Sequence, residues 1–372
     1  MQRFDVVVAG LGPVGALLAA RLSQQGASVL AVDRTAEVFA LPRAVAADDE
    51  VQELLARAGP GLVEPMLHDI AVRFVAPARV VAPESFVDPA RVAAPARELG
   101  EVRFPSSARG FCGLAFFHQP TLEAGLRGLL GAVDVRLGLA LTGLSEDGSG
   151  VTVELGRERV RTSWLVGCDG AGSVVRRLAG IPWRGRVLPQ RWLVCDAVGS
   201  VSQAFTYTCD PERPTVDMPI PGGHRWEWLI RSGPLPDARA LVPRDVEVVR
   251  QVGYQFSVRR AARWQQGRVL LAGDAAHTMP PFAGQGLGAG LRDAWALAAM
   301  LGAGDPSGYQ RLRAPHVREM TRLSLLLGSL LQARYGAATR DTLLGSAFRA
   351  PVLGPWLSAG GPRRPTSGVL DL

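Results

Sequence analysis

A carboxylate followed by a glycine-rich turn stands near residue 274 of the sequence. Asp274 comes soon after the short apolar run 269–272, which has the composition of a buried parallel strand. Pro280-Pro281 then bars helix for several residues, and a series of glycines lets the backbone approach a ligand before a helix begins: Gly284, Gly286, Gly288 and Gly290. Ligands of open α/β sheets bind at the carboxyl ends of the strands, and helix N-termini attract anions. The stretch therefore predicts a site for a phosphate, or for a ring oxygen that gains negative charge.

A second group of glycines lies at the start of the chain. Gly10-x-Gly12-x-x-Gly15 follows the apolar run 4–9, and Asp33 ends the next apolar run. In the dinucleotide-binding fingerprint the first glycine makes the tight turn, the second admits the pyrophosphate and the third lets helix and strand pack. The acid hydrogen-bonds a ribose hydroxyl. The complete pattern predicts an adenine dinucleotide but does not distinguish NAD from FAD.

Two further residues could contribute to the same site. Asp169-Gly170 follows the apolar run 164–168 and precedes a predicted helix over 173–178, so its carboxylate should lie at the same rim of the sheet. A plain turn is the alternative. Arg43 could neutralise a phosphate or be a solvated surface charge, and spacing alone favours the surface charge.

The composition excludes several kinds of chemistry. The formal net charge of +7 comes from arginine alone, because the sequence contains no lysine. Walker lysines, Schiff-base lysines and lysine-carried oxidants are therefore excluded. The arginines are scattered, which favours a phosphorylated cofactor over nucleic acid. The four cysteines lie too far apart for a CxxC pair, so we expect no metal site and a reducing, cytoplasmic location.

We also expect a soluble chain with no membrane partner. No apolar run approaches the ~20 residues that a transmembrane helix needs, and the chain begins directly with a predicted strand rather than a signal peptide. The most apolar late segment is 323–331, for which a buried helix is favoured over a partner-facing one.

Strands and helices alternate around the motifs. Helices are predicted over 48–58 and 120–130, whereas 76–104, rich in Ala and Pro, is expected to be irregular. From 182 to 263 short strand-like runs predict a mostly antiparallel sheet, after which the parallel pattern resumes at Val269. The predicted fold class is α/β (α+β overall), with a Rossmann-like dinucleotide-binding domain and an inserted antiparallel sheet.

With these motifs the sequence resembles the class A flavoprotein monooxygenases, the aromatic hydroxylases with the p-hydroxybenzoate hydroxylase fold. It is most similar to the branch typified by 3-(3-hydroxyphenyl)propionate hydroxylase. The resemblance extends from about residue 4 to about residue 325. Its motifs are the fingerprint with Asp33-Arg34, Cys168-Asp169-Gly170, Gly273-Asp274 with the Pro-Pro-Phe-Ala-Gly-Gln-Gly that follows, Pro42-Arg43-Ala44, His118-Gln119-Pro120 and Arg263-Trp264.

The resemblance implies an enzyme that holds FAD and takes NADPH or NADH as a transient co-substrate. Reduced FAD would react with O2 to give a flavin C4a-hydroperoxide, which hydroxylates a phenolic or other electron-rich aromatic substrate. The candidates for the catalytic role are Arg43, Tyr207 and His224. The residues implied at the FAD site are Gly10, Gly12, Pro13, Val14, Gly15, Asp33, Arg34, Arg43, Gln119, Asp169, Asp274, Pro281, Gly284, Gly286 and Leu287.

The resemblance also implies a division of the chain. A discontinuous FAD-binding domain would comprise 1–70, 105–180 and 265–325, a substrate-binding domain 71–104 and 181–264, and a C-terminal helical segment 326–372. We expect the chain to lack the thioredoxin-like C-terminal domain of larger relatives, and to be a monomer or homodimer whose partners are a small aromatic molecule and O2.

Two departures and several alternatives stay open. Gly288 stands where the family usually has Asn, and Gly172 where it commonly has Arg or Asn, so one flavin contact should be missing and nicotinamide handling is open. A related oxidase, epoxidase or Baeyer-Villiger enzyme, and a catalytically silent flavin-binding protein, are the alternatives. A flavin halogenase, suggested by Trp226-Glu-Trp228, is excluded by the lack of lysine. The Ala-, Arg- and Gly-rich composition suggests a bacterial tailoring step, as in antibiotic biosynthesis.

Overall fold

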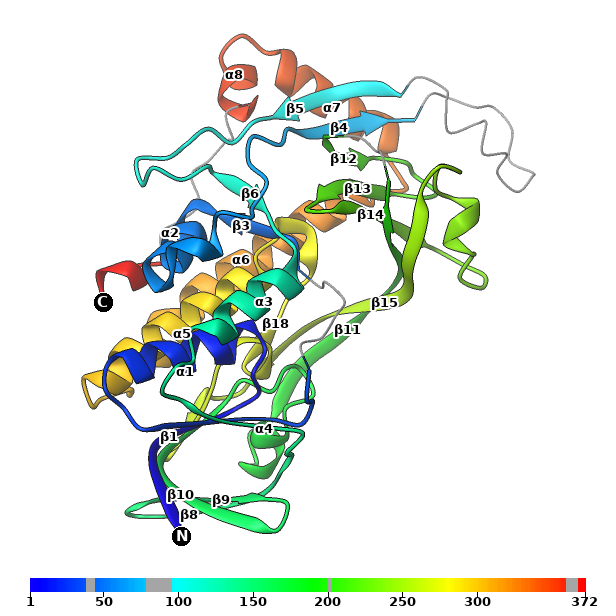
Figure 1. Cartoon of the computed structure of the whole chain (residues 1–372). Helices are drawn as coiled ribbons and strands as arrows, with labels where there is room; N and C mark the ends of the chain where they lie inside the picture. Colours follow the sequence, from blue (N-terminus) through cyan, green and yellow to red (C-terminus); the bar gives the residue numbers. More distant parts are fainter. Residues whose placement is uncertain (38–43, 78–95, 200–202, 359–366) are drawn as a thin grey trace.

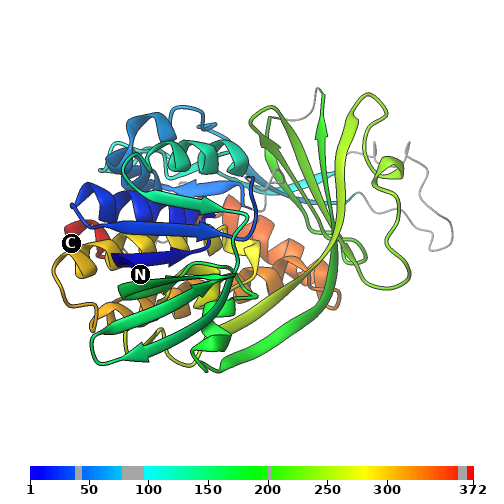
Figure 2. The ribbon, with the colours of Figure 1, turned by 60° about the horizontal axis from the view of Figure 1, so that its bottom comes forward.

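The structure is a computed structural model that describes residues 1–37, 44–77, 96–199, 203–358 and 367–372. Within these ranges the chain forms two eight-stranded sheets, a two-stranded pair and the helices that pack on them. The long helices stack beside one another (Figure 1), and the second sheet stands to one side of the first sheet and its helices (Figure 2).

The first sheet has a parallel core. Its strand order is β16-β17-β10-β1-β2-β7, and the β8–β9 hairpin pairs with β10. Strands β17, β10, β1, β2 and β7 run parallel. The apolar runs within β17, β10, β1 and β2 are largely buried, as parallel strands usually are, whereas β7 at the edge is half-exposed. The bounds are β1 Gln2–Ala9, β2 Val29–Asp33, β7 Asp134–Leu137, β8 Leu141–Asp147, β9 Gly150–Leu155, β10 Glu158–Gly167, β16 Gln265–Gln266 and β17 Val269–Leu271.

Helices α1 and α5 pack closely on one another beside this sheet. Gly290 permits the close approach, because a Cβ there would lie 2.7 Å from Val14 Cγ2. The small side chains of α5 are fully buried in the main core with those of α1. The bounds are α1 Pro13–Gln24, α2 Asp49–Ala58, α3 Gln119–Gly128, α4 Val174–Leu178, α5 Gly286–Gly302, α6 Tyr309–Leu331, α7 Ala337–Arg349 and α8 Leu353–Ser358.

The second sheet has the order β18-β15-β11-β14-β13-β12-β4-β5. Its neighbouring strands are antiparallel except for β12 and β4, which are parallel. The bounds are β4 Val72–Ala76, β5 Arg97–Val102, β11 Trp183–Val198, β12 Phe205–Thr208, β13 Thr215–Ile220, β14 Gly223–Ile230, β15 Glu247–Ala261 and β18 His277–Thr278; the separate pair is β3 Ala46–Asp48 with β6 Leu114–Phe116.

The two faces of the second sheet bury different clusters. One face, which we call the aromatic face, carries Trp192 and Leu229 and packs against Phe116 and Phe282, residues that lie outside this sheet. The opposite face carries Trp226 and Trp228 under the loop that contains the 3-10 helix 238–240. Alternation along each strand therefore sends successive side chains to different surroundings.

Residues 367–372 pack beside α2 in the main hydrophobic core. Val369 is fully buried in the main core. Glu50 of α2 accepts hydrogen bonds from Ser367 N at 3.1 Å and Ser367 Oγ at 2.9 Å, and Arg57 Nη1 donates to the Leu370 carbonyl at 3.2 Å. This short segment therefore packs as part of the core around α2 and α5.

The predicted fold class is confirmed, and two local predictions need correction. Irregular structure was expected over 76–104, but Arg97–Val102 forms β5 on β4; residues 78–95 lie outside the described ranges. The apolar run 323–331 is the last part of α6, and its buried residues include the small Ser324 and Gly328, whereas Leu326 is 67% exposed. Small residues face inward there because α6 lies close to Phe282.

None of the described helices is both long and apolar enough to cross a membrane.

Candidate functional site

The three glycines of the fingerprint meet different surroundings. Gly10 has φ +96°, and a Cβ there would lie 2.5 Å from the Cys168 carbonyl oxygen. A Cβ on Gly15 would lie 1.9 Å from the Gly10 carbonyl oxygen, whereas one on Gly12 would meet nothing within 4 Å. Gly12 is also the N-cap of α1, so no side chain caps this helix start, and Pro13 lies in the first turn. The backbone N–H groups at this end of α1 thus border open space, as a pyrophosphate site requires.

Asp33 lies at the carboxyl end of β2, beside this loop. Its Oδ2 accepts a hydrogen bond from Leu11 N at 2.7 Å, and its Oδ1 accepts from Thr35 N and Oγ1 at 2.8 and 2.7 Å. Asp33 is half-buried, and the neighbouring Arg34 is exposed. The carboxylate therefore shapes the glycine loop, and its remaining acceptor capacity suits a ribose hydroxyl.

Asp169 follows β10 and caps α4. Its Oδ2 accepts from Val174 N at 2.6 Å and Val175 N at 3.1 Å, while Oδ1 is buried with no hydrogen-bond partner among the described residues. Arg176 joins this loop to the Asp274 loop, because its Nη2 donates to the Ala171 carbonyl at 2.8 Å and its Nη1 to the Ala275 carbonyl at 2.9 Å. The two predicted carboxylate motifs are therefore neighbours, and one of them keeps an acceptor for a ligand.

Asp274 lies in the 3-10 turn Gly273–Ala275, with its side chain exposed. A Cβ on Gly273, which has φ +59°, would lie 3.1 Å from Val14 Cγ2, so this turn adjoins the start of α1. The structure thus brings Asp274, Asp169 and the fingerprint glycines to one edge of the first sheet, as the sequence predicted.

A buried carboxylate that the motif analysis did not identify accepts a hydrogen bond from the Gly273 turn. Asp293 of α5 accepts from Gly273 N at 3.1 Å, Arg313 Nε at 2.9 Å and His277 Nε2 at 2.6 Å. Burial opposes ionisation of Asp293, but His277 and Arg313 outweigh it and hold the pKa of this carboxyl below its usual value. His277 therefore supports the loop through its hydrogen bond to Asp293.

The loop before α5 offers a second set of backbone N–H groups. Pro281–Ala283 is a 3-10 helix, Gly284 follows with φ +65°, and α5 begins at Gly286 with no side-chain cap. A Cβ on Gly286 would meet nothing within 4 Å, so there is open space beside the first residue of α5. Backbone N–H groups at an uncapped helix start suit the ring oxygen with negative charge that the sequence analysis expected here.

A buried arginine occupies the space next to Gly288. Arg292 Nε donates to Glu50 Oε2 at 2.6 Å and Nη2 to Asp48 Oδ1 at 2.7 Å. A Cβ on Gly288 would lie 3.0 Å from Arg292 Nη1 and 3.0 Å from Val51 Cγ2. An Asn side chain at this position would therefore crowd the ion pair between α5 and α2, which accounts for the glycine.

Gln119 and Arg43 were expected near the same ligand. Gln119, the first residue of α3, is buried and its Oε1 accepts from Ala44 N at 2.8 Å, so it fixes the backbone that follows the Arg43 position. Arg43 itself lies outside the described residues.

The two other catalytic candidates lie on different faces of the second sheet. Tyr207 donates from Oη to the Phe282 carbonyl at 3.3 Å and stacks on Phe74, so it lies on the aromatic face beside the Pro281 loop. His224 is 1% exposed, packs on Trp226 and has its Nε2 3.3 Å from Asp217 Oδ1, on the opposite face. The structure does not bring His224 together with the ligand loops, because strand alternation turns it away from them.

The aromatic face forms an apolar wall opposite the loop before α5. The ring centroid of Trp192 lies 5.8 Å from that of Phe256 and 5.7 Å from that of Phe282, and Phe205 packs against Phe116 at 5.5 Å. Trp192 is 1% exposed and its Nε1 has no hydrogen-bond partner among the described residues. This wall can exclude water from a reacting ring.

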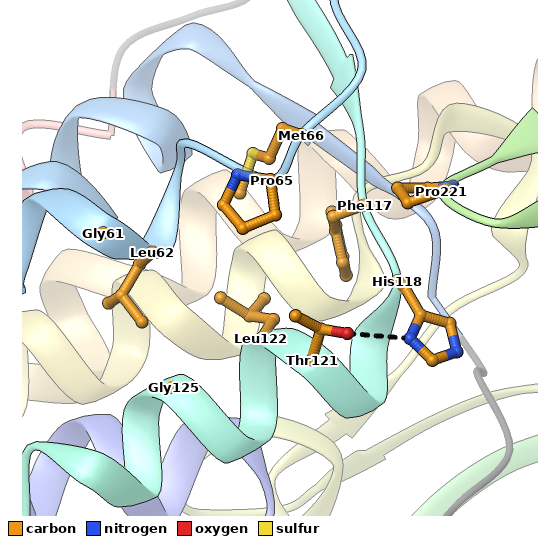
Figure 3. Close-up of a pocket in the computed structure, with 10 residues that line it drawn as sticks. All are labelled: Gly61, Leu62, Pro65, Met66, Phe117, His118, Thr121, Leu122, Gly125 and Pro221. Atoms are coloured by element: carbon orange, nitrogen blue, oxygen red, sulfur yellow. Dashed lines mark hydrogen bonds between the residues drawn. The ribbon is translucent and has the colours of Figure 1, made fainter.

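A separate cavity of about 300 Å³ lies between α3, the loop 61–66 and the β13–β14 turn (Figure 3). Its walls are largely apolar, and its polar groups include His118, whose Nδ1 lies 2.9 Å from Thr121 Oγ1. Burial lowers the pKa of His118. Pro221 closes one side, so the cavity shows directly that the β13–β14 turn reaches the start of α3.

The glycine fingerprint, the parallel sheet and the carboxylate loops define a dinucleotide-binding α/β protein. Its ligand would contact both carboxylate loops and the start of α5. Comparison with protein families identifies the dinucleotide, because residues 3–207 and 235–324 match the FAD binding domain. The chain belongs to this FAD-binding family, and its cofactor is FAD. The open glycine loop, the free acceptor of Asp169 and the uncapped start of α5 fit that cofactor.

Two relatives illustrate the sequence similarity. The chain is 34% identical to the 3-(3-hydroxy-phenyl)propionate/3-hydroxycinnamic acid hydroxylase of Klebsiella pneumoniae (strain 342), over 91% of this chain and 65% of the relative. It is also 34% identical to a probable NADH-specific resorcinol 4-hydroxylase of Rhodococcus jostii (strain RHA1), over 93% of this chain and 69% of the relative. The chain thus spans about two thirds of the length of these relatives, and the resemblance to flavin-dependent aromatic hydroxylases is confirmed.

Solved structures show the same fold. The p-nitrophenol 4-monooxygenase of Pseudomonas putida DLL-E4 superposes with a TM-score of 0.79 at 21% identity, covering 98% of this chain and all of that one. The OxyS anhydrotetracycline hydroxylase of Streptomyces rimosus superposes with a TM-score of 0.73 at 27% identity, covering 100% of this chain and 76% of that one.

Proposed function

We propose that the chain is an FAD-dependent monooxygenase that uses NADH or NADPH and O2 to hydroxylate a phenolic or other electron-rich aromatic substrate. The observation that carries the proposal is the aromatic face of the second sheet, which packs against Phe282 in the loop before α5. When bound and reduced, FAD supplies the activated oxygen. The residues of the chain would hold FAD, orient the ring and keep water out.

The proposed division of labour follows the two sheets. Residues 1–70, 105–180 and 265–325 would bind FAD, residues 71–104 and 181–264 the substrate, and 326–372 would form a supporting helical segment. We assign FAD contacts to the fingerprint glycines with Asp33, to Gln119, Asp169 and Asp274, and to the backbone from Pro281 to Leu287. These assignments are supported by the convergence of those loops at one edge of the first sheet.

The names of the relatives suggest the first substrates to test. We infer that the natural substrate is a small phenol or a polycyclic phenol of a tailoring pathway. The hydroxyphenylpropionate and resorcinol hydroxylases support the former, and the 27% identical anhydrotetracycline hydroxylase the latter. The named NADH specificity of the Rhodococcus relative favours NADH as the first reductant to try.

The test is substrate-dependent oxygen transfer. The purified chain, loaded with FAD, is mixed in air with NADH or NADPH and with 3-(3-hydroxyphenyl)propionate, resorcinol or anhydrotetracycline in turn. We expect at least one phenol to accelerate NAD(P)H oxidation and to gain one ¹⁸O atom from ¹⁸O2. NAD(P)H oxidation that yields only hydrogen peroxide with every phenol would contradict the proposal and indicate an oxidase.

A further inference from the structure

The acid or base that handles the substrate's hydroxyl proton is not identified by the sequence motifs. We propose that Glu227 accepts this proton, a role that rests on the hydroxylation proposed above. Glu227 lies between the two tryptophans of the Trp226-Glu-Trp228 run, in the middle of β14.

Strand register places Glu227 on the aromatic face. Trp226 and Trp228, its neighbours along β14, are buried in the cluster on the opposite face. Glu227 itself pairs with Val216 of β13 and Val194 of β11. Directly paired residues share a face of a sheet, and Val216 belongs to the aromatic face. The Glu227 side chain therefore shares the face that turns toward the loop before α5.

The rows on either side of Glu227 differ in character. One row contains Leu229 and Trp192, which pack in the aromatic cluster. The other row contains Met218, Arg225, Asp196 and Arg250, paired side by side across four strands. Glu227 thus lies at the border between an apolar wall and a charged row, where a ring can be buried while its hydroxyl meets a polar group.

The charged row holds itself together without Glu227. Asp196 accepts from Arg225 Nε at 2.6 Å, Arg225 Nη2 at 3.0 Å and Arg250 Nη1 at 3.2 Å. Arg225 Nη1 is 4.0 Å from Glu227 Oε1. No hydrogen bond to the Glu227 carboxylate is present within the ranges that the structure describes. The side chain is nonetheless only 14% exposed, and within the described residues its carboxylate makes this long ion pair with Arg225 but no hydrogen bond.

The surroundings make this carboxylate a stronger base than an ordinary glutamate. Burial raises the pKa of Glu227, Arg225 and Arg250 lower it in part, and Asp196 raises it further. Within the described part of the chain, His118 also lies near this row, close enough to Asp196 and Arg225 for their charges to act on it. His118 immediately precedes Gln119 of α3, so the charged row faces an element of the FAD-binding side.

The proposed step is a proton transfer without redox change. A phenol O–H bond breaks, its proton bonds to a Glu227 carboxylate oxygen, and the electron pair stays on the phenol oxygen as phenolate. Phenolate is the electron-rich form of the ring that electrophilic oxygen transfer requires. The base must be deprotonated to act, so the rate should fall as pH drops below the raised pKa of Glu227.

The experiment compares Glu227→Gln with Glu212→Gln. Glu212 is an exposed carboxylate of the β12–β13 connection that pairs with Arg334, and its loss should leave activity unchanged. Each FAD-loaded protein is assayed across pH with the panel phenol that the wild type hydroxylates fastest. We expect Glu227→Gln to keep FAD and phenol binding, to lower kcat roughly 100-fold, and to lose the acidic limb of the kcat profile.

The outcomes separate the two proposals. A wild type that hydroxylates while Glu227→Gln retains the same acidic limb would overturn the role of Glu227 and leave the hydroxylase standing. A Glu227→Gln protein that loses FAD would indicate a structural role and would also overturn the proposal. Glu227→Asp, which keeps a carboxylate, should retain FAD and show an acidic limb if residue 227 is the base. If the wild type hydroxylates no phenol, the proposed hydroxylase function is contradicted, and the role of Glu227 falls with it.

Discussion

Gly12 and Gly15 are separated by two residues, yet the structure gives them different tolerances. A side chain on Gly12 would point into open space, whereas a Cβ on Gly15 would overlap the Gly10 carbonyl oxygen at 1.9 Å. Gly12 also has φ −68°, a backbone angle that any residue adopts. Gly12 is therefore needed for ligand binding and Gly15 for folding.

We expect Gly12→Val to fold normally but to lose FAD, because its side chain would fill the pyrophosphate site. Gly15→Ala should instead yield little folded protein. The ratio of flavin to protein absorbance after desalting and the melting temperature of the apoprotein check the two expectations. A Gly12→Val protein that stays yellow and fully loaded would argue against the assigned pyrophosphate site.

Asp293 should be indispensable although no motif contains it. Asp293→Asn leaves the fully buried Arg313 without its carboxylate, which costs roughly 3–5 kcal/mol for a broken buried pair. It also weakens the acceptor for Gly273 N, so FAD affinity should fall with stability. Chemical unfolding of the apoprotein measures the first effect and FAD titration the second. Unchanged stability would show that Arg313 finds another partner.

His316 gives the folded state a pH dependence. Burial, with Arg313 adding to it, lowers the pKa of His316 from 6.5 to about 3. Between these two pH values the unfolded chain binds a proton on this ring that the folded chain does not, so stability is full above pH 6.5 and falls as the pH drops toward 3.

We expect the wild type to lose roughly 2 kcal/mol more than His316→Gln between pH 7 and pH 5, at ~1.4 kcal/mol per pH unit below the unfolded pKa. Urea unfolding at the two pH values measures the difference. Equal losses in the two proteins would show that another group sets the acid sensitivity.

The residues that the sequence identified are those whose role is local. Gly10, Gly12, Gly15 and Asp33 lie within one strand–helix–strand unit, so spacing alone predicts their arrangement. The supporting ion pairs could not be predicted, because Arg292 meets Asp48 and Glu50 from more than 240 residues away. From sequence alone, a charged residue within a helix is predicted to lie on the solvent-exposed face.

At the scale of elements, helix α6 supports the loop before α5. Ser324 Oγ donates to the Pro280 carbonyl at 2.6 Å, and a Cβ on Gly328 would lie 2.4 Å from Phe282 Cδ2. The small residues on this side of α6 therefore set the position of Phe282, which belongs to the aromatic cluster.

We expect Gly328→Leu to displace Phe282 and cost about 1–3 kcal/mol of stability from overpacking. It should also increase the share of NAD(P)H oxidation that yields peroxide, since the site would admit water. Ser329→Leu, one residue further on and exposed, is the matched control. Equal peroxide yields in both variants would show that α6 does not set the loop.

The sequence predicted the parallel elements better than the second sheet. Continuous apolar runs identify buried parallel strands directly. Strands β11 and β15 are 16 and 15 residues long, but part of each is exposed and arginine-rich, so the sequence predicted only shorter strand-like runs there. The parallel pairing of β4 with β12 joins segments more than 120 residues apart, and no local pattern specifies it.

At the scale of the whole molecule, residues 367–372 pack into the core beside α2 and α5. We expect Val369→Asp to destabilise the fold by roughly 2 kcal/mol or more, because it buries an unpaired carboxylate. Leu372→Asp, at a position 54% exposed, should leave stability unchanged. Thermal unfolding of the two variants compares them. Similar melting temperatures would show that the segment contributes little to the core.

The long antiparallel pair β11–β15 extends from beside the first sheet into the second sheet (Figure 1). At one end Ala261 N donates to the Ala276 carbonyl at 2.7 Å, next to the Asp274 turn, and at the other end Val198 pairs with Glu247. The register shifts between Val187 and Arg191. If residues 181–264 bind the substrate as proposed, recombination between relatives can exchange both strands together, provided both crossovers fall between the Asp274 turn and the shift at Val187. A crossover on the other side would join two strands that were never selected to pair.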